Sequence, residues 1–145
     1  MDPWTIRPAT LKDAPALTRC IDAAYAVYAA RILDLPDVSQ GIAEDISRHL
    51  VFVAERDDQI LGGVILIPKA GYALLATIAV DPSAAGQGVG RGWLMQAEAA
   101  ARRLDLHEIR LSTHVDMPEN VSLYQHLGWQ VTERRGNKVK MRRAL

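Results

Sequence analysis

Cysteine is nearly absent from this sequence of 145 residues, in which Cys20 is the only one. A single cysteine excludes an intrachain disulfide and any zinc site built from several cysteines. The apolar neighbours Leu17 and Ile21 indicate a thiol that faces the core and is chemically inert rather than nucleophilic.

An excess of charge of one sign and long apolar runs are also missing. Basic and acidic residues number 17 each, so the formal net charge is zero and no overall field would attract nucleic acid or an anionic membrane. No basic, apolar leader is found, and no apolar run approaches the roughly 20 residues of a membrane-spanning helix. We therefore expect a cytoplasmic protein without nucleic-acid or membrane partners.

The composition is that of an ordinary globular protein. Hydrophobic residues make up 49% of the chain and charged residues 23%. A chain of this length is expected to fold as a single domain, residues 1–145, and to bury its own core without disulfides.

The most informative stretch combines an apolar segment, a glycine-rich loop and an alanine-rich helix. Residues 72–80 predict a strand that is covered on both faces. The loop that follows has glycine at alternate positions, Gly86, Gly88 and Gly90. Backbone N–H groups of such a loop, next to the N-terminus of a helix, suit the binding of a phosphate or pyrophosphate.

The glycine spacing by itself leaves other interpretations open. It lacks the wider final spacing of a dinucleotide fingerprint. Gly90 is followed by Arg91 and not by the Lys-Ser/Thr of a nucleotide P-loop. A tight turn that lets a helix and a strand approach closely would use the same residues.

Residues 73–104 resemble the acyl-coenzyme A binding region of the GCN5-related N-acetyltransferase (GNAT) superfamily. That family carries an Arg/Gln-x-x-Gly-x-Gly/Ala loop after a strand with a Val-Asp-Pro-like end, and here Ala85 stands where arginine or glutamine is usual. A second segment, 117–129, is similar to the Met-x-Glu-Asn-x-x-Leu-Tyr-x-x-Leu-Gly-aromatic run of one GNAT branch.

The order of the predicted elements agrees with this resemblance. Strands are expected near residues 4–7, 51–55, 60–67, 72–80, 109–113, 130–133 and 138–143. Helices are expected near 14–30 and 39–50, from the glycine loop to 104, and over 118–128. The resulting order predicts a GNAT-like α/β sandwich, with a mixed central sheet of about seven strands and about four helices.

Spacing also predicts local contacts of charged side chains. Thr10 and Asp13 form an approximate capping pattern before the first long helix. Glu98 and Arg102 are expected to form an exposed ion pair, because they lie four residues apart on a helix. The basic residues within 134–143 either contact nucleic acid or protect a sheet edge, and the lack of an aromatic platform favours the second interpretation.

The resemblance implies acetyl-CoA as the acyl donor and no metal. It implies that the pyrophosphate binds to the backbone of Ala85, Gly86, Gln87, Gly88, Val89, Gly90 and Arg91. The pantetheine arm would pair with the backbone of Ile78, Ala79 and Val80. Tyr124 matches the tyrosine that many GNAT enzymes place at the departing thiolate. Asn120, one helical turn earlier on the same face, either binds the pantetheine or caps the helix.

The group that accepts the proton of the amine is left open. Many GNAT enzymes use a carboxylate on the strand that here spans 72–80, and this strand contains none. Asp81 follows the strand but also suits a turn. His114 is of the residue type best suited to act as a base near neutral pH. A water chain that reaches Glu44 or Asp45 is a third alternative.

The leading hypothesis is N-acetyl transfer from acetyl-CoA to a primary amine by direct attack on the thioester. The acceptor is a small molecule or a peptide, and the protein is a monomer or a homodimer. Tyr25, Tyr28 and Arg31 either bind a small amine that bears a carboxylate or an aromatic group, or the tyrosines belong to the core and Arg31 is a surface charge. The alternatives are a non-catalytic acyl-CoA-binding sensor or interaction module and a nucleotide-binding α/β protein.

Overall fold

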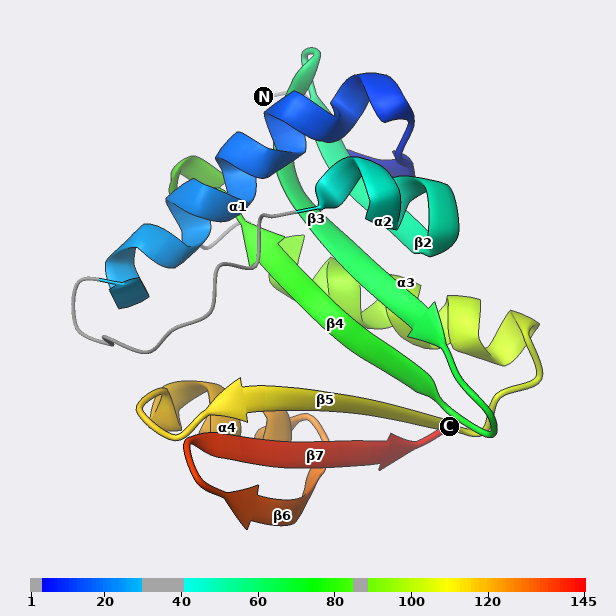
Figure 1. Cartoon of the computed structure of the whole chain (residues 1–145), viewed down its shortest axis with the longest axis vertical. Helices are drawn as coiled ribbons and strands as arrows, with labels where there is room; N and C mark the ends of the chain where they lie inside the picture. Colours follow the sequence, from blue (N-terminus) through cyan, green and yellow to red (C-terminus); the bar gives the residue numbers. More distant parts are fainter. Residues whose placement is uncertain (1–3, 30–40, 85–88) are drawn as a thin grey trace.

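A computed structural model of the chain describes residues 4–29, 41–84 and 89–145 (Figure 1). Within these residues, seven strands form one sheet in the order β1-β2-β3-β4-β5-β7-β6. Neighbouring strands are antiparallel except for β4 and β5, which are parallel. The predicted fold class, an α/β sandwich around a mixed sheet, is confirmed.

The elements follow the predicted order. The strands are β1 (Thr5–Pro8), β2 (Leu50–Arg56), β3 (Gln59–Pro68), β4 (Ala73–Val80), β5 (Glu108–His114), β6 (Gln130–Arg135) and β7 (Lys138–Ala144). The helices are α1 (Ala14–Ala29), α2 (Ile42–Arg48), α3 (Val89–Arg103) and α4 (Pro118–His126). Short 3-10 turns, η1 (Leu11–Asp13) and η2 (Pro82–Ala84), lie between β1 and α1 and after β4.

The second helix is shorter than predicted. It begins at Ile42, because Gly41 before it has a φ of +76°, outside the range of a right-handed helix. It ends at Arg48, because His49 is already in an extended conformation.

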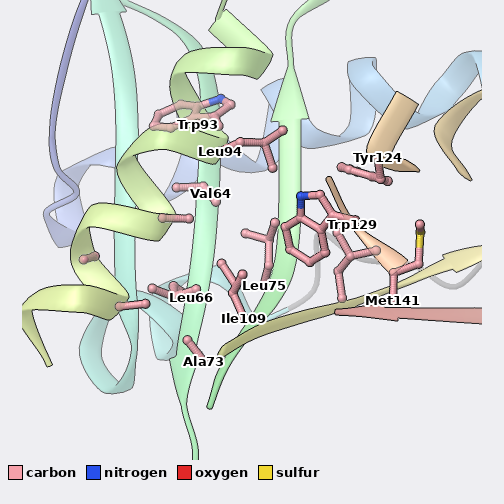
Figure 2. Packing of buried hydrophobic residues seen from close by; sticks show 14 of the residues in the cluster. Val64, Leu66, Ala73, Leu75, Trp93, Leu94, Ile109, Tyr124, Trp129 and Met141 are labelled. Carbon is pink, nitrogen blue, oxygen red and sulfur yellow. The ribbon is translucent and has the colours of Figure 1, made fainter. Parts of the chain in front are cut away.

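The helices cover the two faces of the sheet (Figure 1). On one face, α1 and α2 pack on the first half of the sheet through a cluster that includes Leu17, Ile21 and Ile42. On the other face, α3 and α4 enclose a larger cluster around Trp93 and Trp129 (Figure 2). None of the helices in the described residues is long and apolar enough to cross a membrane.

Two consecutive glycines in β3 let the helices approach both faces closely. A Cβ on Gly62 would lie 2.5 Å from the Ala79 carbonyl oxygen and 2.9 Å from Nε1 of Trp93 in α3. A Cβ on Gly63 would overlap the side chain of Leu17 in α1. The missing side chains therefore set the distance of each helix from the sheet.

The predicted ion pair between Glu98 and Arg102 is wrong, because Glu98 pairs with Arg143 instead. Its side chain is buried and accepts a hydrogen bond from Arg143 of β7 at 2.7 Å. Glu98 lies on the face of α3 that turns toward the sheet, so a strand 45 residues later in the chain supplies its partner. A spacing rule for isolated helices does not include that strand.

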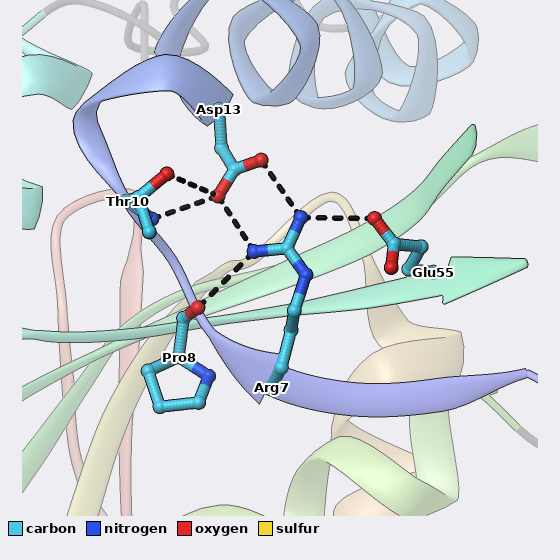
Figure 3. Close-up of polar contacts among 5 residues, drawn as sticks. All are labelled: Arg7, Pro8, Thr10, Asp13 and Glu55. Atoms are coloured by element: carbon cyan, nitrogen blue, oxygen red, sulfur yellow. Dashed lines mark hydrogen bonds and ion pairs between the residues drawn. The ribbon is translucent and has the colours of Figure 1, made fainter. Parts of the chain in front are cut away.

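The first strand is held to the 3-10 turn η1, which precedes α1, by a polar network (Figure 3). Arg7 donates to both carboxylate oxygens of Asp13, at 2.8 and 2.9 Å, and to Glu55 of β2 at 2.9 Å. The Thr10 N–H donates to Asp13 at 2.7 Å, as the capping pattern predicted. The hydrogen bonds from Arg7, opposed in part by burial, hold the pKa of Asp13 down at about 2.

Cys20 has the inert position that its neighbours predicted. Its side chain is 3% exposed, and burial raises the pKa of the thiol to about 12. The thiolate, which is the reactive form, is therefore scarce at neutral pH.

Candidate functional site

The parallel strands β4 and β5 separate soon after they meet. Of the described residues, only Ala73 with Ile109 and Leu74 with Arg110 are in register, and beyond them the strands diverge (Figure 1). A cleft of about 630 Å³ opens at this place. It is lined by residues of α1, β4, α3, β5, the start and body of α4, the β6–β7 turn and the start of β7: Ala24, Tyr25, Leu75, Ala76, Ile78, Ala79, Val80, Gly90, Leu111, Ser112, Thr113, His114, Met117, Asn120, Tyr124, Asn137 and Lys138.

A β-bulge at Ala76 accompanies the separation. Ala76 is an extra residue between Leu75 and Thr77, which pair with consecutive residues of β3. A bulge shifts the alternation of side chains by one and increases the local twist. As a result, Leu75 and Ile78 both face the α3 side, whereas Ala79 faces the α1 side.

The register between β3 and β4 determines which backbone groups face the cleft. The Asp81 N–H donates to the Leu61 carbonyl at 2.7 Å, so this pair is hydrogen-bonded. Hydrogen-bonded pairs alternate with non-bonded pairs in an antiparallel ladder, and Ala79 therefore also turns its backbone toward β3. The Ala79 carbonyl accepts a further hydrogen bond from Nε1 of Trp93 at 3.0 Å.

By the same alternation, Ile78 and Val80 turn their backbone groups away from β3 and toward the cleft. The Tyr25 hydroxyl, which lies in the cleft wall, donates to the Ile78 carbonyl at 3.3 Å. The three residues expected to contact the pantetheine all line the cleft, but they do not all offer backbone hydrogen bonds to it. Ile78 and Val80 turn their backbone N–H and C=O groups toward the cleft, whereas those of Ala79 point toward β3.

The predicted pyrophosphate loop is described only in part. Ala85, Gly86, Gln87 and Gly88 lie outside the described residues. Helix α3 begins directly after them at Val89, whose side chain is buried, and Gly90 lines the cleft. A Cβ on Gly90 would meet only Cγ2 of Val80, at 3.7 Å. The exposed Arg91 is not among the lining residues.

Tyr124 lies in the cleft wall, where the end of α4 holds it. The Gly128 N–H donates to Gln125 and the Trp129 N–H to Tyr124, at 3.1 and 2.9 Å. These two bonds form a Schellman motif, for which Gly128 supplies the required left-handed backbone at φ +98°. The Trp129 ring packs against the Tyr124 ring, as the hydrophobic contact of such a motif does (Figure 2).

Asn120 also lines the cleft, one turn before Tyr124. Its side-chain amide contacts Sδ of Met117 at 3.3 Å, and no hydrogen bond from a side chain caps the start of α4. Pro118 occupies the first turn of this helix, as predicted. Asn120 therefore does not cap the helix, and its place in the cleft wall is compatible with the other role considered, binding of the pantetheine.

Of the candidate proton acceptors, His114 alone lines the cleft. Its Nδ1 accepts a hydrogen bond from the Asp116 N–H at 3.0 Å, which places the proton of the neutral ring on Nε2. Asp81 accepts from the Ser83 N–H at 2.9 Å in a local turn. Glu44 is exposed and lies 3.7 Å from Arg48.

Asp45, the last of these candidates, belongs to α2 and is not a lining residue either. Burial raises the pKa of its carboxyl group above the usual value. The described cleft lining contains no Asp or Glu side chain.

The residues considered for acceptor binding are only partly described. Tyr25 lines the cleft, whereas the side chain of Tyr28 and all of Arg31 lie outside the described part of the chain. Sequence analysis did not select Ser112, Asn137 and Lys138, which also line the cleft. The alternation of β5 could have placed Ser112 beside His114, but the return of the final hairpin to the cleft is a tertiary feature.

No group of three or more His, Cys, Asp or Glu side chains suited to a metal ion occurs among the described residues. The prediction of a metal-free site stays a prediction.

The chain resembles known proteins over most of its length. Residues 19–129 match the acetyltransferase (GNAT) family. The uncharacterized N-acetyltransferase YjgM of Escherichia coli is 25% identical, over 86% of this chain and 81% of that protein.

Two solved structures share the fold. The PaiA N-acetyltransferase of Thermoplasma acidophilum, in complex with coenzyme A, has a TM-score of 0.88 at 19% identity, over 99% of this chain and 100% of that one. A GNAT family acetyltransferase of Elizabethkingia anophelis with acetyl-CoA bound has a TM-score of 0.75 at 18% identity, with both chains covered in full.

Proposed function

This chain belongs to the acetyltransferase (GNAT) family, and we propose that it transfers an acetyl group from acetyl-CoA to a primary amine. The observation that carries the proposal is the cleft between the diverging strands β4 and β5, with Tyr124 in its wall. We further propose that residues 1–145 act as one catalytic domain.

The exposed edge of β4 suits the pantetheine arm of the donor. Ile78 and Val80 turn backbone groups toward the cleft, and an extended amide chain can add to such an edge as a further strand would. The two solved relatives with CoA and acetyl-CoA in their structures share this fold and support the choice of donor.

The start of α3 suits the pyrophosphate. The first N–H groups of a helix have no partner within it and attract anions. The Gly90 backbone lines the cleft, and its missing side chain leaves room there. We assign the same role to the backbone of residues 85–88, which precede the helix.

Two groups of the chain then act on the reacting atoms. The Val80 N–H donates to the thioester carbonyl oxygen and stabilises the negative charge that forms when the amine nitrogen attacks the carbonyl carbon. As the C–S bond breaks, the Tyr124 hydroxyl donates its proton to the departing sulfur, and the resulting phenolate regains a proton from water. The amine loses its own proton to water, because the described cleft lining holds no carboxylate.

His114 orders the cleft wall in this scheme. Its Nδ1 is engaged by the Asp116 N–H, so accepting a proton there would break the bond that shapes the β5–α4 connection. His114 is therefore assigned a positioning role, and the water molecules of the open cleft carry the amine proton away.

Calorimetric titration with acetyl-CoA and release of the CoA thiol with a broad panel of amines test this proposal together. We expect saturable binding and amine-dependent release. Tight binding without release by any amine would favour an acyl-CoA sensor. Binding of ATP or NAD that CoA does not displace would favour a nucleotide-binding protein.

A further inference from the structure

Three basic side chains lie in one row across β5, β7 and β6. His114 is the register partner of Lys138, and Lys138 is the register partner of Arg135. Residues directly opposite each other on antiparallel strands project to the same face. His114 and Lys138 line the cleft, so the row begins in the cleft wall and runs outward to the edge strand.

The row lies on the face of β5, β7 and β6 that points away from α3 and α4. The apolar residues of β5 and β7 that alternate with the row, Ile109, Leu111, Val139 and Met141, belong to the cluster under α3 and α4. Lys138 and Arg135 are both exposed. Lys138 is therefore accessible both to solvent and to a ligand bound in the cleft.

The other basic residues on this face have carboxylate partners. Lys140, next in line on β7, lies 3.4 Å from Glu133, and Arg142 and Arg110 both contact Glu108. Among the described residues, no ion pair joins Lys138 or Arg135 to a carboxylate, and His114 approaches the exposed Asp116 at 3.7 Å. In the part of the chain that the structure describes, the positive charges of Lys138 and Arg135 therefore have no carboxylate partner.

The pairing of Lys138 with Arg135 is unfavourable for the stability of the fold. Like charges directly opposite each other on neighbouring strands repel, and these two exposed side chains contribute little to the hydrophobic core. An anionic group in the cleft would remove the repulsion. A cationic group would increase it, and the described lining offers no carboxylate to a second amine.

We propose that the acceptor amine carries an anionic group, which Lys138 binds at the open end of the cleft. Arg135 adds to the positive field, and Ser112 and Asn137 provide neutral polar groups beside it. The inference rests on the proposed acetyl transfer and narrows its substrate to amines with a carboxylate or a phosphonate-type group. Polyamines are excluded as preferred acceptors.

Matched acceptors test the inference. Glycine, β-alanine, γ-aminobutyrate and the common α-amino acids are each compared with their carboxamides, with the aminophosphonates of equal length and with diamines. Thiol release from acetyl-CoA is measured. We expect kcat/KM for the anionic members to exceed that of the carboxamides by roughly tenfold or more. The faster of the two anions identifies the charged group.

Variants on one strand then locate the effect. Lys138→Gln should raise KM for the anionic acceptor by roughly tenfold with kcat little changed, because a charge contact that is equal in the ground and transition states affects binding alone. Lys138→Arg, which keeps the positive charge, should have a KM for the anionic acceptor close to that of the wild type. Lys140→Gln removes one positive charge from the same strand and face but not from the cleft, and should leave KM unchanged.

The possible failures are distinguishable. Turnover with no preference for anionic members, or an equal loss in Lys140→Gln, would overturn the inference and leave the acetyl transfer standing. Bound acetyl-CoA with no turnover of any amine would refute the transfer, and the inference with it.

Discussion

The ring of Tyr124 lies against the indole of Trp129, with centroids 5.7 Å apart and planes inclined by 57° (Figure 2). The backbone joins the same two residues, because the Trp129 N–H donates to the Tyr124 carbonyl at 2.9 Å. The end of α4 thus holds Tyr124 through its main chain and through its side chain. This double constraint keeps the hydroxyl-bearing ring in the cleft wall.

Tyr124→Phe should lower kcat by roughly 10- to 10⁴-fold, since it removes the hydroxyl that we propose as the proton donor to the departing sulfur. The affinity for acetyl-CoA should change little. Phenylalanine keeps the contact with Trp129, so the melting temperature should stay near that of the wild type. A kcat close to wild type, measured where chemistry limits the rate, would remove Tyr124 from the mechanism.

Gly128→Ala should reduce both stability and kcat. The φ of +98° is unfavourable for alanine, and a substitution of this kind costs on the order of 1–2 kcal/mol. Relaxation of the turn would move Tyr124. Gly71→Ala is the control, because Gly71 has a similar φ of +84° in an exposed loop outside the cleft. An equal effect of both variants on kcat would show that the turn at Gly128 does not position Tyr124 for catalysis.

Gly90→Ala should weaken acetyl-CoA binding without harming the fold. The new Cβ meets only Val80, at an ordinary van der Waals distance, and alanine favours a helix over glycine by about 1 kcal/mol. We expect an unchanged or higher melting temperature and a Kd raised by roughly tenfold. Unchanged affinity in calorimetry would argue against close approach of the donor to Gly90.

The two glycines of β3 should differ in their tolerance of alanine. Gly62→Ala places a Cβ 2.5 Å from the Ala79 carbonyl and disturbs its hydrogen bond from Trp93, so backbone must move. We expect a loss of about 3 kcal/mol in urea unfolding. Gly63→Ala meets the end of the Leu17 side chain, which can change rotamer, and should cost less. The reverse order would disprove this account.

The pH dependence of stability should include Asp13. Its pKa is lowered to about 2, so its ion pair with Arg7 stabilises the fold fully above the unfolded pKa, near 3.8. That contribution, roughly 2 kcal/mol, decreases as the pH falls from about 5 toward 2. The difference between wild type and Asp13→Asn in urea unfolding should shrink over this range. A difference independent of pH would show that the charge is unimportant.

Several elements could be predicted from the sequence because they depend on neighbouring residues. The cap of Thr10 by Asp13 and the end of α4 at Gly128 involve residues within one turn of each other. The strands of the sheet followed from alternation and apolar runs. Tyr124 and Asn120 were placed in the cleft through a local segment that resembles a known family.

Other features required residues far apart in the chain. Arg143 replaced Arg102 as the partner of Glu98, and Arg7 and Glu55 joined the cap at Asp13. The bulge at Ala76 depends on how β4 pairs with β3, and it decides which residues face each side of the sheet. No local periodicity contains that information, because a register is a relation between two strands.

The sequence by itself determined the family, the order of the elements and the residue types offered to the cleft, because periodicity, turns and motifs are local properties. Only the tertiary structure decided that β4 and β5 diverge, that Val80 and not Ala79 turns its backbone toward the cleft, and that Lys138 lines the cleft without a carboxylate partner among the described residues. These depend on strand pairing across the whole sheet, where burial and hydrogen bonding of distant segments select one register.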